Sequence, residues 1–409
     1  MIRLRMLAAG LAALACVAGT AQATSVADVF EPRPTPPPAT YPGSFTNAPA
    51  FHYKVELPGG HLNAASHAEW GDPVVDGEHI YVGAAAGQGL YVLSRRDGAL
   101  VRVFPAGNSV EAPATIDDGV VYFSDTGGNT FAYTVAGQQL WRHDGSAPIL
   151  SAPAVVEGKV IITNVDDLAV ALEQSSGALV WQVKAKRDLT RAAELALYAA
   201  PEVVVMPAAE GQSSEALLGF STGTLVGVDL ETGEERWRRE VGEGRYPDLV
   251  SAPVLGGADV YTAGYFEPLV AIDQASHTVR WRLDVGGAFR PVLSEDAAVL
   301  FHPGTDGSLR AVATLTGAVL WTWESGTSGA ITSPTITEAG LVVASSEGSV
   351  YLIDPATGVE SWRWHEPYLL RGVSSVPVVD GRQLLFVSNA GFLYSMLVPQ
   401  DAPPRRLWP

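Results

Sequence analysis

Beyond residue 50 the chain is a succession of short runs in which apolar and polar residues alternate, and these runs return in a fixed order. Alternation with a period of two predicts half-buried β-strands, because successive side chains of a strand point to opposite faces. Each return starts with a proline that opens a β-rich run, and further alternating runs follow it. The opening prolines are Pro73, Pro113, Pro153, Pro201, Pro253, Pro291, Pro334 and Pro377.

The spacing of these prolines, 38 to 52 residues, fits one propeller blade of four short strands. The sequence therefore predicts an all-β fold, an eight-bladed β-propeller of four-stranded blades over residues 51–399. The eighth repeat runs out at "LYSMLVPQ" without a fourth run. The segment "FHYKVELPGG", residues 51–60, matches the fourth run of another repeat and has Tyr53 where that repeat has Trp281. We expect this N-terminal strand to complete the last blade and close the ring.

A turn and an aromatic residue separate the third and fourth runs of most repeats, as in "GVDLETGEERW". Glycine in the turn adopts positive φ without steric cost and favours a bulge at the start of the next strand. These glycines are Gly98, Gly137, Gly177, Gly233, Gly317 and Gly358. Four residues later comes an indole that we expect to pack into the joint with a neighbouring blade. The tryptophans are Trp141, Trp181, Trp237, Trp281, Trp321 and Trp362.

Two repeats depart from this spelling. His277 stands in the place of the turn glycine, and Arg102 stands in the place of the tryptophan. Histidine tolerates the left-handed conformation better than most residues, and arginine lays its stem across apolar surface. Both are interpreted as structural variation, with a functional role as the alternative.

Composition narrows the classes of partner. The chain has 47% hydrophobic and 17% charged residues, and its formal net charge is −18. Such a charge repels polyanions, and the sequence has no basic patch that would overcome it, so nucleic acid is excluded as a partner. We expect a monomer that meets other proteins.

The N-terminal segment has the pattern of an export signal. Residues 1–23 carry two arginines, an apolar run and an A-x-A site, which predicts a cleaved signal peptide. The alternative is a lipoprotein signal cleaved before Cys16, which would then be lipidated and tether the protein. Residues 24–50 are rich in proline and predict an extended linker, and residues 400–409 predict an exposed tail. No membrane span is expected, because no later run reaches about 18 apolar residues.

The recurring "A-x-D-x-x-T-G-x-x-x-W", nearly intact in "GVDLETGEERW" and "LIDPATGVESW", resembles the repeat of the PQQ-like propellers over residues 51–399. That resemblance implies either of two functions. Quinoprotein dehydrogenases of this superfamily hold PQQ beside Ca²⁺, many with a disulfide between adjacent cysteines, whereas Cys16 is the sole cysteine here. No catalytic residue, cofactor or metal site is therefore predicted. The acidic turn residues Asp117, Asp118, Asp166 and Asp167 are interpreted as solvated, and His61 and His67 as a weak candidate for metal binding.

The second branch is the BamB family of periplasmic scaffolds, which the chain resembles in size, blade number and export signal. This resemblance implies binding to the periplasmic region of BamA through a Leu-x-Leu-Arg loop and an Asp-x-Asp pair. Leu195, Leu197 and Tyr198 match the first motif with tyrosine in the place of arginine. Asp248 matches the second motif, with Val250 in the place of its second aspartate. The alternative for Leu195 and Leu197 is a short helical turn that covers a blade edge.

Two long inserts in the repeat follow Trp181 and Trp237 and are adjacent in the predicted ring. Long loops on a rigid scaffold are common sites of binding, and arginine and tyrosine are enriched at interaction hot spots. The predicted partner-binding residues are Arg191, Leu195, Leu197, Tyr198, Arg245, Tyr246 and Asp248. The sequence thus predicts a non-catalytic scaffold in the periplasm or on the periplasmic face of the outer membrane. The alternatives are a PQQ-dependent or other propeller enzyme and a propeller that binds an envelope polysaccharide.

Overall fold

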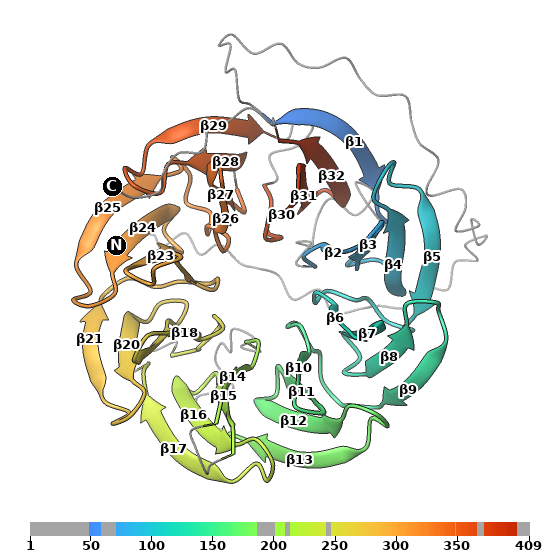
Figure 1. Ribbon diagram of the computed structural model, residues 1–409, viewed down its shortest axis with the longest axis horizontal. Helices are drawn as coiled ribbons and strands as arrows, with labels where there is room; N and C mark the ends of the chain where they lie inside the picture. The colour runs from blue at the N-terminus through green and yellow to red at the C-terminus, as the bar shows by residue number, and fades with distance from the viewer. Residues whose placement is uncertain are drawn as a thin grey trace, which may run out of the picture.

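Eight four-stranded antiparallel sheets stand around a common axis and form a ring (Figure 1). The computed structural model describes residues 49–58, 71–185, 201–208, 213–242, 247–347, 349–365 and 372–398, and these residues contain β-strands and no helix. The predicted eight-bladed β-propeller is confirmed. In the parts of the chain that are described, no helix is long and apolar enough to cross a membrane.

Each blade runs from a short strand at the axis to a longer strand at the circumference. The innermost strands are β2 (Val74–Asp76), β6 (Thr115–Asp117), β10 (Ala154–Val156), β14 (Val204–Met206), β18 (Val254–Gly256), β22 (Val292–Leu293), β26 (Thr335–Thr337) and β30 (Val378–Asp380). The second strands are β3 (His79–Val82), β7 (Val120–Ser124), β11 (Lys159–Asn164), β15 (Glu215–Gly219), β19 (Asp259–Thr262), β23 (Val299–Pro303), β27 (Gly340–Ala344) and β31 (Gln383–Ser388).

The third strands are β4 (Gly89–Ser94), β8 (Thr130–Thr134), β12 (Leu168–Glu173), β16 (Thr224–Asp229), β20 (Leu269–Asp273), β24 (Ser308–Ala313), β28 (Ser349–Ile353) and β32 (Phe392–Leu397). The outermost strands are β5 (Leu100–Pro105), β9 (Gln139–His143), β13 (Leu179–Lys184), β17 (Glu235–Glu240), β21 (Val279–Leu283), β25 (Val319–Glu324), β29 (Glu360–His365) and β1 (Ala50–Glu56). We number the blades one to eight, from β2–β5 to β30–β32 with β1.

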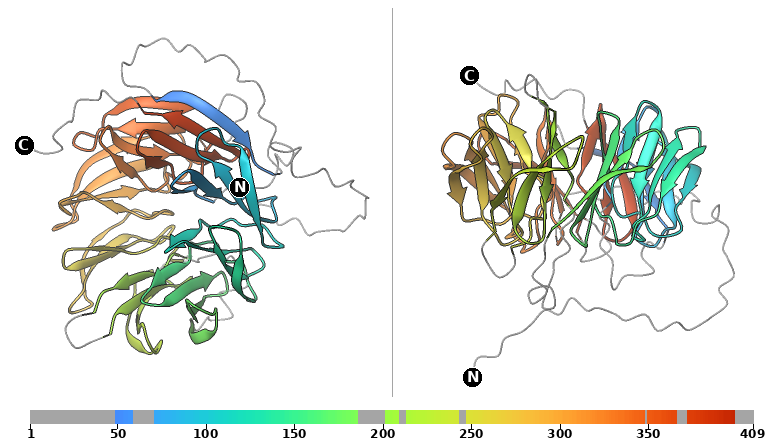
Figure 2. Two further views of the ribbon diagram at one scale, coloured as in Figure 1. Left: turned by 45° about the vertical axis from the view of Figure 1, so that its right-hand side comes forward. Right: turned by 90° about the horizontal axis from the view of Figure 1, so that it is seen from below.

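The ring has two faces, which the edge-on view in Figure 2 separates. Turns that join the first strand to the second, and the third to the fourth, lie on one face, here called the turn face. Loops that join the second strand to the third, and each blade to the next, lie on the other, here called the loop face. Backbone hydrogen bonds connect neighbouring loops, as where Gly287 N–H donates to Gly264 O at 3.0 Å.

The N-terminal strand closes the ring as predicted. β1 pairs antiparallel with β32, from Ala50 opposite Leu397 to Glu56 opposite Phe392. The hydroxyl of Tyr53 donates to Arg95 O at 2.8 Å in the turn of blade one. The backbone pairing of β1 with β32 and the contact of Tyr53 with the blade-one turn therefore both contribute to closing the ring.

The indoles of the outermost strands lie against the third-to-fourth turn of the next blade. A Cβ added to Gly177 would lie 2.6 Å from Trp141 Cε3, and one added to Gly233 would lie 2.8 Å from Trp181 Cγ. Trp181 Nε1–H donates to Leu230 O at 2.8 Å. The same arrangement brings Trp281 to Gly317 and Trp321 to Gly358, whereas Trp362 packs into the cluster between blades seven and eight. At these four glycines a side chain would require the indole to move, because an added Cβ would lie only 2.6–2.8 Å from it.

His277 and Arg102, the two residues that depart from the repeat, also lie at joints between blades but make different contacts there. His277 has φ 54° and stacks on Trp237 with ring centroids 4.4 Å apart. Trp237 Nε1–H donates to Glu215 Oε1 at 2.6 Å. The indoles at the same position in four other blades donate to a backbone carbonyl, namely those of Trp141, Trp181, Trp281 and Trp321. Arg102 Nη1–H donates to Val135 O at 3.1 Å beside Gly137. Each substitution therefore keeps a contact between two blades.

The hydrophobic core lies between blades. The cluster that joins blades one and two stacks Phe104 on Tyr133 with ring centroids 5.1 Å apart, and Phe123 on Phe131 at the same distance. Corresponding clusters fill the other joints around the ring. Each blade is thus stabilised by burial of apolar surface against its two neighbours, and the loops on the loop face sit on a rigid support.

Candidate interaction site

The structure describes the ends of the two predicted partner-binding inserts. Six of the predicted residues lie outside the described residues, namely Arg191, Leu195, Leu197, Tyr198, Arg245 and Tyr246. The first insert leaves the described chain after Ala185 and returns at Pro201, and the second leaves after Gly242 and returns at Pro247. Whether the inserts meet one site depends on how these four ends are held.

In blade four, the end of β15 and the loop that joins it to β16 hold ends of both inserts. A Cβ on Gly219 would lie 2.9 Å from Pro201 Cγ, where the first insert returns. Gly223 has φ 78°, and a Cβ there would lie 2.7 Å from Pro247 Cβ, where the second insert returns. Gly242 N–H donates to Gly223 O at 3.0 Å. The two inserts therefore enter and leave the ring at adjacent points on the loop face.

Asp167 of blade three secures the other end of the first insert. Its carboxylate accepts the Ser221 N–H at 2.8 Å and also the Ser221 hydroxyl, so it bridges blades three and four. Ala185 N–H donates to Asp167 O at 3.0 Å. Asp167 is only 2% exposed, so the prediction of a solvated turn residue is wrong for it, while its neighbour Asp166 is exposed. The sequence did not reveal that Ser221, from another blade, would bind it.

Asp248, the seventh predicted partner-binding residue, is 2% exposed. Its backbone carbonyl accepts the Tyr265 N–H at 3.2 Å, and Leu249 N–H donates to Phe220 O at 3.2 Å. A Cβ on Gly264 would lie 2.7 Å from Asp248 O. The segment thus connects the loop of blade four to that of blade five, and Asp248 positions the blade-five loop from beneath.

The blade-five loop between β19 and β20 carries an aromatic pair at its tip. The rings of Tyr265 and Phe266 meet edge to face, with centroids 4.7 Å apart and an angle of 68°. Phe266 is 60% exposed. A cross-blade contact supports this loop from blade six, where the Thr305 hydroxyl donates to Tyr265 O at 3.2 Å. The pair is therefore fixed in place on the loop face, next to the segment at which the second insert returns.

Three charged residues precede or open innermost strands and lie toward the axis of the ring. Arg290 Nη1 and Glu202 Oε2 are 3.8 Å apart although they belong to blades six and four. Asp72 of blade one is half-buried and accepts the Val376 N–H at 2.6 Å. Burial raises the pKa of Asp72 to about 7 against the effect of this hydrogen bond, and the negative charge of Glu202 raises it further. Burial also raises the pKa of Glu202, and Arg290 opposes that shift.

His302 of β23 is completely buried, between blades five and six. A Cβ on Gly287 would lie 2.4 Å from its Cε1, so the backbone of a neighbouring loop packs directly against the ring. Burial lowers the pKa of His302 to about 4, and the positive charge of Arg310 contributes to the lowering. The imidazole is thus a neutral packing group beneath the loops that carry Gly287 and Tyr265.

The part of the chain that the structure describes contains no cluster suited to a metal ion. Over the described ranges, no group of three or more histidine, cysteine, aspartate or glutamate side chains is placed to hold a metal ion. Asp117 is exposed and accepts a hydrogen bond from Gln174 Nε2 at 2.8 Å, and Asp118 is an exposed turn residue with φ 44°. His61 and His67 lie outside the described residues.

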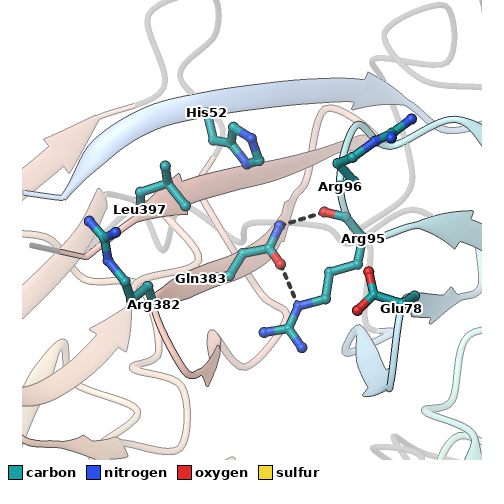
Figure 3. A pocket seen from close by; sticks show the side chains of 7 residues that line it. All are labelled: His52, Glu78, Arg95, Arg96, Arg382, Gln383 and Leu397. Carbon is teal, nitrogen blue, oxygen red and sulfur yellow. Dashed lines mark hydrogen bonds between the residues drawn. The ribbon is translucent and has the colours of Figure 1, made fainter. Parts of the chain in front are cut away.

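A depression of about 320 Å³ lies on the turn face at the joint of blades eight and one (Figure 3). Its floor is Gln383, whose amide accepts Arg95 Nε–H at 2.8 Å and donates to Arg95 O at 3.0 Å. Arg95 also pairs with Asp380 at 2.6 Å. These polar groups are engaged in joining the last blade to the first, so we interpret the depression as part of the closure.

Sequence reasoning missed Phe266, the charged trio and His302. Of these, only Phe266 had a signal, because "AGYFEPL" is the one second-to-third loop with an aromatic pair at its tip. Glu202 and Arg290 occupy positions at which no residue type recurs from one repeat to the next, so the repeat does not predict their contact. The burial of His302 depends on loops from a neighbouring blade, which no local pattern indicates.

A family model and several curated relatives support one family. The profile of the family described as outer membrane protein assembly factor BamB matches residues 102–322 and 294–402. The chain is 24% identical over 329 residues to the outer membrane protein assembly factor BamB of Burkholderia pseudomallei, covering 79% of this chain and 82% of that one. It is also 24% identical over 266 residues to the BamB of Yersinia pestis, covering 63% and 64% of the two chains.

Solved structures share the fold. BamB from Moraxella catarrhalis superposes with a TM-score of 0.70 at 18% identity, covering 86% of this chain and all of that one. The quinohemoprotein alcohol dehydrogenase of Comamonas testosteroni superposes with a TM-score of 0.65 at 14% identity, covering 88% and 78%. At these identities the likeness shows the propeller alone and does not distinguish an assembly factor from an enzyme.

Proposed function

We propose that this chain, which belongs to the family of the outer membrane protein assembly factor BamB, is a non-catalytic scaffold that takes part in outer-membrane protein assembly. Its site is the loop face of blades three to five, and its partner is the periplasmic region of BamA. The family membership supports the process. We further propose that the chain contacts BamA and that it has no catalytic activity.

One observation carries the choice of surface, namely the shared anchorage of the two predicted partner-binding inserts at the end of β15 and in the loop that follows it. Gly219 contacts Pro201 and Gly223 contacts Pro247, so both inserts are held at their bases by the same backbone. Binding is favoured when the loops of an interface are fixed beforehand, because less conformational entropy is lost on association. Arg191, Leu195, Leu197, Tyr198, Arg245 and Tyr246 are proposed to contact the partner, and Asp248 to support them.

The proposal is tested by titrating the purified full-length chain with the purified periplasmic region of BamA. We expect saturable binding that the double substitution Leu195→Asp with Leu197→Asp weakens by tenfold or more. The matched control is Leu315→Asp, because Leu315 is 75% exposed on the turn face and its substitution should leave binding unchanged. Failure of the parent chain to bind would rule out BamA, and equal binding by the parent and both variants would rule out this surface.

The enzyme alternative has its own measurement. The chain is incubated with PQQ and Ca²⁺, and reduction of an artificial electron acceptor is followed with a panel of alcohols. A scaffold gives no turnover above the protein-free control. Turnover that requires PQQ would replace the scaffold proposal with that of a dehydrogenase.

We also propose that the protein acts in the periplasm after export through residues 1–23, with lipid attachment at Cys16 as the alternative route of anchorage. Labelling cells with a fatty-acid analogue distinguishes the two, using Cys16→Ser as the control. Incorporation that is lost in Cys16→Ser would establish the tether. A shortened N-terminus that begins near residue 24 would establish the cleaved signal.

A further inference from the structure

Two exposed arginines stand on the rim of the depression at the joint of blades eight and one (Figure 3). Arg96 lies in the third-to-fourth turn of blade one, and Arg382 lies in the first-to-second turn of blade eight. The corresponding turns of blades two to seven have valine, serine, glutamate, alanine or leucine at the position of Arg96. The repeat therefore does not account for a positive charge at this place.

The two guanidinium groups keep donors that a ligand can use. Arg96 pairs with Asp97 at 3.1 Å, but the two side chains are 85% and 46% exposed, and an exposed pair of this kind is weak. Arg382 Nε–H donates to Val398 O at 3.3 Å. A guanidinium has five N–H donors, arranged so that two of them can bind two oxygens of one phosphate. Both side chains can therefore turn toward an anion in the depression.

The floor of the depression belongs to the closure of the ring and is almost neutral. Arg95 pairs with Asp380 at 2.6 Å, and its Nε–H donates to Gln383 Oε1 at 2.8 Å. Asp380 thus neutralises Arg95 and holds the adjacent turn in place. Glu78 is the one acidic side chain that lines the depression, and it opposes an anion. A ligand would therefore meet two exposed arginines against one carboxylate.

Two features favour a membrane lipid over a soluble phosphate. Phe51 is 40% exposed and precedes His52, which lines the depression. Exposed apolar side chains beside basic ones are typical of protein surfaces that bind at the membrane interface. Residues 24–49 join the ring at this end of β1, so a chain anchored at Cys16 would be connected to this face. The loop face of blades three to five lies on the opposite side and would stay accessible to a partner.

We propose that the turn face at the joint of blades eight and one binds an anionic phospholipid, with a headgroup phosphate between Arg96 and Arg382 and with Phe51 in the interfacial region of the membrane. The net charge of −18 does not prevent this contact, because exposed charges farther away than about 8 Å are largely screened at physiological ionic strength. Arginines close to an anionic membrane surface each contribute to binding within that range. The proposal goes beyond the scaffold function, since it assigns a ligand to the face opposite the proposed partner site.

The test uses the chain from residue 24, which keeps the whole described ring and lacks the apolar signal segment. Co-sedimentation measures its binding to vesicles of phosphatidylcholine with and without phosphatidylglycerol. We expect binding that requires phosphatidylglycerol and that Arg96→Gln with Arg382→Gln weakens by about tenfold or more. The matched control is Arg142→Gln with Arg238→Gln, which removes two exposed arginines from other blades and changes the net charge equally. Equal affinities of the two double variants, or no binding by the parent, would overturn the proposal.

Two further variants show whether the ligand is a lipid. Glu78→Gln removes the opposing carboxylate and should strengthen binding to the same vesicles severalfold, a gain that a misfolded variant would not give. Phe51→Ser should weaken vesicle binding severalfold with unchanged thermal unfolding, because the ring is exposed. If neither variant alters vesicle binding, the proposal fails. It also fails if glycerol 3-phosphate binds through the two arginines and the vesicles do not bind, because the ligand is then a soluble phosphate.

Discussion

The joints between blades and the loop face of blades three to six are built on opposite principles. At the joints the same contact recurs, with an indole, a turn glycine and a backbone carbonyl as in Trp181, Gly233 and Leu230. On the loop face each contact occurs once, as between Asp167 and Ser221 or between Asp248 and Tyr265. Residues that recur in the repeat stabilise the ring, whereas residues that occur once give one sector of the loop face contacts that the other sectors lack. The predictions below test that division.

The largest effect is expected at a joint. Trp181 is 6% exposed, donates to Leu230 O and packs on Gly233. Trp181→Ala removes this contact and leaves a cavity between blades three and four, so the free energy of unfolding should fall by about 3–5 kcal/mol. Chemical denaturation followed by tryptophan fluorescence measures the change. A loss below about 1 kcal/mol would show that the indoles do not carry the joints.

Many contacts at the joints between blades could be predicted from the sequence, because the residues that form them recur in several repeats. The place of Tyr53 in the closing strand followed from its alignment with Trp281, and the turn glycines followed from their spacing. The contacts of the loop face could not be predicted in the same way. The burial of Asp167 depends on Ser221, and that of Asp248 depends on the blade-five loop. Both of these partners belong to other blades. The contacts do not recur from repeat to repeat, so the sequence pattern does not predict them.

The second prediction concerns a buried residue that is particular to one joint. The pKa of His302 is about 4 in the folded protein, against 6.5 as its usual value, so the folded state disfavours the protonated ring. The packing of neutral His302 therefore contributes its full stability above pH 6.5 and loses it as the pH falls from 6.5 toward 4. A difference of this size corresponds to about 3 kcal/mol at or below pH 4. His302→Leu should unfold less readily than the parent under these acidic conditions.

The control for this prediction is the parent chain at each pH, because Asp72 acts in the opposite direction. Its folded pKa of about 7 lies above the usual 3.8, so protonation of Asp72 stabilises the fold as the pH falls from 7 toward 3.8. The difference in unfolding free energy between His302→Leu and the parent removes that contribution. If the difference is the same at pH 7 and pH 4.5, His302 does not titrate with folding.

Alanine substitutions at two turn glycines distinguish the cost of backbone strain from the cost of losing the contact with a tryptophan. Gly233 and Gly158 have nearly equal φ values of 72° and 75°, but a Cβ on Gly233 would meet the Trp181 ring while one on Gly158 meets nothing within 4 Å. Replacement of either by alanine should cost about 1–2 kcal/mol from the left-handed conformation. Gly233→Ala should cost about 1–2 kcal/mol more, because the indole must move. Thermal and chemical denaturation of both variants measure the difference, and equal losses would mean that the turn is not a docking surface.

The smallest effect on stability is expected at the exposed tip of the blade-five loop. Phe266 is 60% exposed, and its loop is held by the backbones of Asp248 and Gly286 and by Thr305, none of which needs its ring. Phe266→Ala should therefore change the free energy of unfolding by less than about 0.5 kcal/mol. Denaturation curves of this variant and of Leu315→Ala should superpose on that of the parent. A loss comparable to that of Trp181→Ala would place Phe266 among the residues that hold the ring, and the division between joints and loop face would fail at that residue.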